Sequence, residues 1–100
     1  MKAPQDCHDM TELRAAIDAL DAGIVAQLKA RADYIDRAVQ LKQTNGLPAR
    51  IEVRVEEVVT KVRAEAVAQG LDPDLVEDIW RRLINWSIAR EEQTLGPERP

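Results

Sequence analysis

The chain has 100 residues, of which 45% are hydrophobic and 32% charged, and its formal net charge is −4. This length predicts one small domain over 1–100, and a composition rich in Ala, Val, Leu, Glu and Arg is typical of an all-helical protein. An acidic chain without a basic run is unlike proteins that bind nucleic acid. No apolar run approaches the ~20 residues that cross a bilayer and no signal-peptide core opens the chain, so we expect a cytoplasmic protein that does not bind membranes.

Residues 1–8 are predicted to form a flexible arm, and the first helix follows Asp9. Asp9 and Glu12 have the spacing of a capping box. From there to Thr44, apolar residues recur at three- and four-residue intervals and predict one continuous amphipathic helix. The helix should end before Asn45-Gly46, a typical C-terminal stop.

Two shorter helices are predicted after this stop. The second runs over 49–69 and is closed by Gly70, in the place of a left-handed cap. The third opens with Asp72-Pro73, a cap residue followed by proline at the first helical position, and ends near Gln93. Residues 94–100 are then a polar tail.

The length of the first helix predicts a homodimer. About 35 residues at 1.5 Å each span ~50 Å, whereas a compact chain of this size has a radius of gyration of only ~13 Å. Two helices of about 20 residues do not cover an apolar stripe of that length, so we expect three-helix protomers that intertwine with a second copy. The alternative is a break at Gly23 or near Asn45, which would give a three-helix monomer.

Three cations on the first helix form the main candidate site. Arg31 and Lys42 are eleven residues apart and therefore share a face, with only ~20° of drift. Arg14 lies seventeen residues before Arg31, roughly 100° round the helix. This pattern predicts a protein that clamps an anion with two cations and lends the third to a neighbouring subunit.

Other types of chemistry are poorly represented. Ser87 has no evident base beside it, and there is no glycine-rich phosphate loop, so an enzyme here would use neither a nucleophile nor a cofactor. Cys7 and His8 are adjacent in the arm and make a weak chelate, so no metal is expected. Positioning and electrostatics remain, with Arg54 and the one-face pair Ser87 and Glu91 as further candidates.

These residues carry a resemblance to the all-helical chorismate mutase family. Its opening signature is matched by Leu13-Arg14-x-x-Ile17-Asp18-x-x-Asp21. The family's later arginine, lysine, second-helix arginine and third-helix small polar residue are matched by Arg31, Lys42, Arg54 and Ser87. The match covers roughly residues 10–92. The start, Met1-Lys2-x-Pro4-x-Asp6-Cys7, is similar to one branch, the isochorismate-pyruvate lyases of salicylate formation.

The resemblance implies an intertwined dimer that converts chorismate, a small dicarboxylate, into prephenate. Arg31 and Arg54 would bind substrate with Ser87, while Arg14 would enter from the partner chain. Lys42 would face the ether oxygen of the breaking bond, because a compact ammonium suits a localised negative charge. The arginines suit the carboxylates, being planar and bidentate.

Two positions differ from the usual mutase pattern. Mutases carry a carboxylate where this chain has Val55, and the lyase branch is apolar there, so Val55 favours isochorismate as an alternative substrate. Glutamine is common where this chain has Glu91. An ionised glutamate does not donate a hydrogen bond, so we expect Glu91 to act when protonated and activity to rise at acidic pH. In the alternative, Glu91 faces solvent or pairs on the side of Arg90.

A non-catalytic helical dimerisation module is the second hypothesis. Charged, Ala-rich helices with a long apolar stripe occur in many adaptors. Against this hypothesis, Arg31 and Lys42 are flanked by Leu28, Ile35 and Val39, where burying a cation without a counter-anion is costly. A third possibility is a relative that binds the diacid without converting it.

Overall fold

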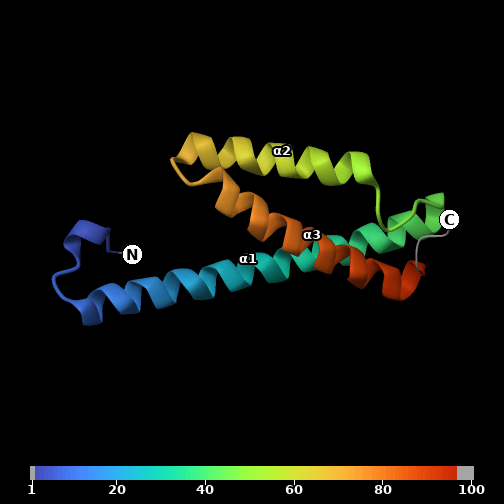
Figure 1. Cartoon of the computed structure of the whole chain (residues 1–100). Coiled ribbons are helices and arrows are strands. Elements are labelled where there is room, and N and C mark those ends of the chain that lie inside the picture. Colours follow the sequence, from blue (N-terminus) through green and yellow to red (C-terminus); the bar gives the residue numbers. More distant parts are fainter. Residues whose placement is uncertain (1, 97–100) are drawn as a thin grey trace. The chain divides into compact units, whose positions relative to one another are not determined.

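The computed structural model describes residues 2–96, and in this range every regular element is helical (Figure 1). The elements are the 3₁₀ helix η1 (Pro4–Asp6) and the α-helices α1 (Met10–Asn45), α2 (Glu52–Gln69) and α3 (Pro73–Leu95). The expected all-helical class with three helices is therefore confirmed. The chain divides between Tyr34 and Ile35 into two compact units, each described by itself below.

The first unit contains η1 and the N-terminal part of α1. The predicted cap is present, because the Glu12 amide donates to Asp9 Oδ1 at 2.8 Å. The Glu12 carboxylate does not close the box on Asp9, as a standard box would, but accepts from the His8 amide at 3.0 Å and pairs with Lys2 at 3.1 Å. The predicted arm thus contains one 3₁₀ turn and an ordered link to α1.

The apolar stripe of the first unit is largely exposed in the single chain. Ile17, Leu20 and Ile24 keep about half of their surface in solvent, at 46%, 51% and 56%. Isolated exposed apolar residues are ordinary, but these lie at helical spacing on one element. This contiguous stripe is an apolar surface of the kind that marks an interface.

The second unit contains the end of α1, a connecting segment, α2 and α3. Gly46 and Gly70 both have φ of +74°, the left-handed conformation that the predicted stops require. Asp72 caps α3 by accepting from the Asp74 amide at 2.9 Å. α3 continues to Leu95, so the predicted tail begins two residues late, and 97–100 lie outside the described residues.

The predicted start of the second helix at residue 49 is wrong, because α2 begins at Glu52. Ile51 has extended backbone, with φ of −125°, and Ala49 belongs to the connecting segment. Two contacts hold Ala49 outside the helix. Its methyl group is buried in the core, and its carbonyl accepts a hydrogen bond from Lys42 instead of from the next helical turn.

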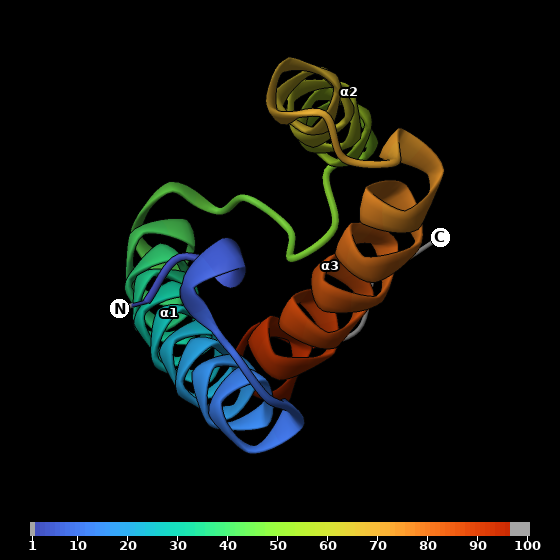
Figure 2. The ribbon, with the colours of Figure 1, turned by 90° about the vertical axis from the view of Figure 1, so that its left-hand side faces the viewer.

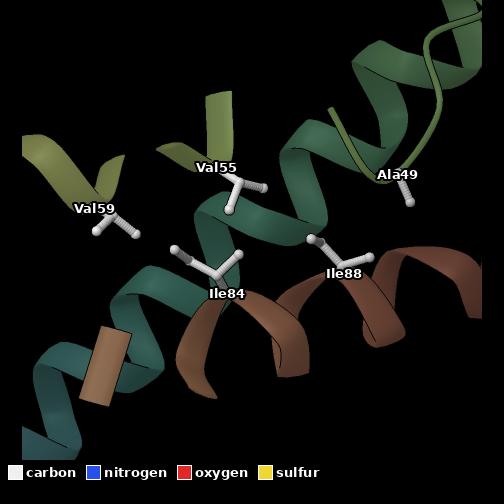
Figure 3. Packing of buried hydrophobic residues seen from close by; sticks show 5 residues of the cluster. All are labelled: Ala49, Val55, Val59, Ile84 and Ile88. Carbon is white, nitrogen blue, oxygen red and sulfur yellow. The ribbon is translucent and has the colours of Figure 1, made fainter. Parts of the chain in front are cut away.

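The core of the second unit lies between α2 and α3. Ile84 and Ile88 of α3 face Val55 and Val59 of α2, with Ala49 beside Ile88 (Figure 3). The two valines are four residues apart on α2 and the two isoleucines are four residues apart on α3, so each helix presents one narrow apolar strip to the other. In both ribbon views α2 folds back beside α3 through the turn at Gly70 (Figure 2).

A network of ion pairs joins the exposed sides of α2 and α3. Arg81 of α3 makes a bidentate contact with Glu56 of α2, at 3.1 and 3.0 Å, and also pairs with Glu77 at 2.6 Å. Arg63 of α2 donates to Glu77 at 2.8 Å. The hydrogen bonds from Arg81 lower the pKa of both Glu56 and Glu77.

Replacing Arg81 should destabilise the protein in a pH-dependent way. A carboxyl group whose pKa is lowered by folding adds stability above its ordinary pKa and loses that contribution as the pH falls. Arg81→Met should therefore lower the urea midpoint at pH 7, and the difference from wild type should shrink below about pH 4. Urea unfolding at fixed protein concentration measures this.

The neighbouring Arg82 provides the matched control, because it is exposed and takes no part in the network. Arg82→Met should leave the midpoint close to wild type at both pH values. An Arg81→Met effect of equal size at pH 7 and pH 3 would show that the network does not act through ionised carboxylates.

Candidate active site

Lys42 lies in the last turn of α1, where its charge is favoured by the helix dipole. Its ammonium nitrogen donates to the Ala49 carbonyl at 2.9 Å and lies 2.9 Å from Glu91 Oε1. Only 16% of the Lys42 side chain is exposed. The connecting segment and α3 therefore fix the ammonium from two directions.

Glu91 is buried, with 5% of its side chain exposed, and faces Lys42. The alternatives in which Glu91 faces solvent or pairs beside Arg90 are wrong, because Arg90 instead makes a bidentate contact with Asp36, at 2.7 and 2.9 Å. Although Lys42 is near, Glu91 Oε1 receives no aligned hydrogen bond within the described part of the chain. The contact is one of charge, and this oxygen keeps capacity for another hydrogen-bond partner.

This arrangement suits electrostatic work on a bound anion. An ammonium group has three N–H bonds, and only the one to Ala49 is a directed bond in the described residues. Glu91 lies on a second side of the ammonium, which leaves a further N–H for an oxygen that approaches Lys42. Lys42 and Glu91 are largely shielded from solvent, so the effective dielectric around them is below that of water. An electrostatic contact with Lys42 is therefore stronger than it would be in water.

The structure also places Ser87 and Val55 inside the second unit. Ser87 is one turn before Glu91 on α3 and is buried, at 3% exposure, with its hydroxyl donating to the Leu83 carbonyl at 2.8 Å. Val55 points into the core beside Ile84 (Figure 3). Ser87 therefore shares the buried face of α3 with Glu91, whereas Val55 serves the packing of α2 on α3.

The three predicted arginines are placed differently from Lys42 and Glu91. Arg54 is exposed on α2, and its guanidinium pairs with Glu57 one turn later. Arg14 and Arg31 belong to the first unit. The structure thus brings together Lys42 and Glu91, with Ser87 on the same helix, and it holds Arg54 on a carboxylate of its own helix.

A surface hollow of about 520 Å³ opens beside Lys42. Its wall is made by the end of α1, the connecting segment and the end of α3. Among the predicted site residues only Lys42 lines it. Arg50, which no sequence pattern singles out, supplies a second cation.

Several contacts in this region could not be predicted from the sequence. The Ala49 carbonyl is a backbone atom, and the hydrogen bond from Arg50 to Asn85 joins residues 35 positions apart. Asp36 and Arg90 are 54 apart. Helical periodicity predicts neighbours along one helix, so these contacts between elements emerge only from the fold.

Other classes of site find no support among residues 2–96. No group of three or more His, Cys, Asp and Glu side chains has the geometry to hold a metal ion in this range. No helix formed by these residues is both long enough and apolar enough to span a bilayer.

Comparison with known proteins identifies the family to which the chain belongs. An isochorismate pyruvate lyase of Pseudomonas aeruginosa is 35% identical over 92 residues, covering 91% of this chain and 89% of that protein. The T-protein of Enterobacter agglomerans is 33% identical over 90% of this chain but only 25% of its own length, and that of Haemophilus influenzae is 31% identical over 84% and 22%. Residues 13–92 match the chorismate mutase type II model, and the chain belongs to that family.

Proposed function

We propose that this protein rearranges chorismate to prephenate, using electrostatic preorganisation without a protein nucleophile or a cofactor. The observation that carries the proposal is the Lys42 ammonium, held at 2.9 Å from both the Ala49 carbonyl and Glu91 Oε1. In a pericyclic reaction the protein stabilises the compact conformer and the negative charge that grows on the ether oxygen. A pre-positioned ammonium supplies that stabilisation without further reorganisation.

The remaining roles follow the family resemblance. Arg31 and Arg54 bind the substrate carboxylates, Ser87 contributes a polar contact, and Lys42 with Glu91 faces the ether oxygen. Arg54 would leave Glu57, an exposed pair of small energetic value, to reach a dianion. Binding a doubly charged substrate offsets the loss of such a pair, because charge-assisted bidentate contacts are stronger.

We further propose an intertwined homodimer built on the length of α1. The exposed stripe of Ile17, Leu20 and Ile24 supports this, since a second copy would bury it. In the dimer Arg14 would complete the site of the partner subunit. The reaction would then require two chains in each active site.

Isochorismate-pyruvate lyase activity is the second candidate. Two observations favour it: the chain has the apolar Val55 where mutases carry a carboxylate, and the lyase of Pseudomonas aeruginosa matches over nearly its whole length. The lyase reaction can also be written as a pericyclic step in which a hydrogen moves within the substrate, so it requires much the same residues.

Supplying chorismate and isochorismate separately tests the two candidates. We expect prephenate from chorismate, measured by chromatography of the quenched reaction. Equal amounts of salicylate and pyruvate from isochorismate would establish the second candidate. Turnover of neither substrate, with no thermal stabilisation by millimolar salicylate, would contradict the proposal and favour a non-catalytic dimerisation module.

Removing the Lys42 charge should greatly reduce catalysis. Deletion of one such donor typically costs ~2.7–4 kcal/mol, so Lys42→Ala should lower kcat/KM by about 10²–10³-fold. Lys29→Ala is the matched control, because Lys29 is an exposed lysine paired with Asp33. Steady-state rates at saturating and limiting substrate give both parameters, and a rate within threefold of wild type would remove Lys42 from the mechanism.

The same variant tests whether Arg14 acts across the dimer. Arg14→Ala and Lys42→Ala homodimers should both be nearly inactive. Unfolding them together and refolding should yield heterodimers with one intact site, and a recovery of about a quarter of wild-type activity follows from random pairing. Sedimentation confirms the dimer, and no recovery in the mixture would place Arg14 in the site of its own chain.

Glu91 should make activity depend on pH. An ionised Glu91 would repel the charge growing on the ether oxygen, whereas a protonated one would donate to it. We expect the wild-type rate to be higher at acidic than at neutral pH, and Glu91→Gln to hold its rate to higher pH. If the pH–rate profiles of wild type and Glu91→Gln coincide, this role of Glu91 is contradicted.

A further inference from the structure

The orientation of Lys42 depends on a segment without regular structure. Residues 46–51 connect α1 to α2, and the Ala49 carbonyl within them accepts the one directed hydrogen bond of Lys42. At its beginning the segment is held by the Gly46 amide, which donates to the Lys42 carbonyl at 2.8 Å, and by the Leu47 amide, which donates to Asn45 Oδ1 at 3.2 Å. These bonds do not reach Ala49, so its carbonyl must be fixed by other contacts.

Two contacts with the body of the second unit fix this carbonyl. Ala49 is 7% exposed, and its methyl group packs in the cluster with Ile88 (Figure 3). The next residue, Arg50, donates from Nη2 to Asn85 Oδ1 of α3 at 2.9 Å. The Arg50 side chain therefore adds a directed bond to α3 next to the buried Ala49.

α3 therefore controls both partners of Lys42. Glu91 belongs to α3 and meets the ammonium directly. Asn85 lies six residues earlier on the same helix, about 9 Å along its axis, and holds Arg50. Because a helix is rigid over this distance, the two contacts define the position of the ammonium relative to one element.

We propose that Arg50 and Asn85 are positioning residues that orient the Ala49 carbonyl and, through it, the Lys42 ammonium. The inference rests on the proposed function, in which Lys42 faces the developing charge. Arg50 and Lys42 also line the same hollow, so a direct contact of Arg50 with substrate is the competing explanation. The two explanations predict different kinetic changes. Loss of positioning lowers kcat, whereas loss of a substrate contact raises KM.

Comparing Arg50→Ala with Asn85→Ala separates these explanations. Asn85→Ala keeps the charge of Arg50 but removes its acceptor. Positioning predicts that both variants lower kcat about tenfold with little change in KM, and that the double variant is no worse than either one. A rise in KM confined to Arg50→Ala, or additive losses in the double variant, would overturn the proposal.

Two further variants act as controls. Asn85→Asp retains an acceptor for Arg50 and should keep kcat near the wild-type value. Glu52→Gln removes the charge of the other Arg50 partner, at 3.3 Å, and should also leave kcat unchanged. Failure of Asn85→Asp to preserve kcat in a protein with normal thermal stability would count against positioning.

A measurement independent of turnover distinguishes this inference from the proposed function. The ¹H–¹⁵N signal of the Lys42 ammonium, identified by its loss in Lys42→Ala, reports directly on its hydrogen bonding. It should shift or broaden in Arg50→Ala and Asn85→Ala but not in Glu52→Gln. An unchanged signal overturns the positioning role, whereas full activity of Lys42→Ala overturns the proposed function alone.

Discussion

The Lys42 ammonium, held between a backbone carbonyl and a buried carboxylate, is the constraint on which the proposed site depends. Burying a charged pair costs desolvation energy that the attraction within the pair only partly offsets, so the contact is weak evidence for stability by itself. Within residues 2–96, Glu91 Oε1 receives no aligned hydrogen bond although Lys42 lies 2.9 Å away, so the pair is not arranged for maximum stability. Its arrangement instead suits a site that receives an anionic ligand beside Lys42.

Much of the fold could be predicted from local patterns, while the site could be predicted only in part. The caps at Asp9, Gly46, Gly70 and Asp72 follow from turn chemistry that depends on a few adjacent residues. The start of α2 was predicted three residues early, because burial of Ala49 and its bond from Lys42 override helix propensity. The Arg50–Asn85 and Asp36–Arg90 contacts join distant segments and leave no periodic signal.

Membership of the chorismate mutase type II family narrows the chemistry without selecting one reaction. The mutase and lyase reactions would both require cationic groups that bind a doubly negative substrate, together with a cation near the ether oxygen. We propose that Val55 and Glu91 decide between the two reactions. In the proposed mechanism Val55 would offer no acceptor to a substrate hydroxyl, and Glu91 would donate a hydrogen bond only when protonated.

The most direct test of the central claim compares how Lys42 contributes to binding the transition state and the product. A bicyclic ether dicarboxylate that mimics the compact transition state and prephenate would each be titrated calorimetrically into wild type and Lys42→Ala. If Lys42 serves the developing charge, the variant should lose far more affinity for the bicyclic compound than for prephenate. Equal losses for both ligands would show that Lys42 merely binds anions, and would contradict the account.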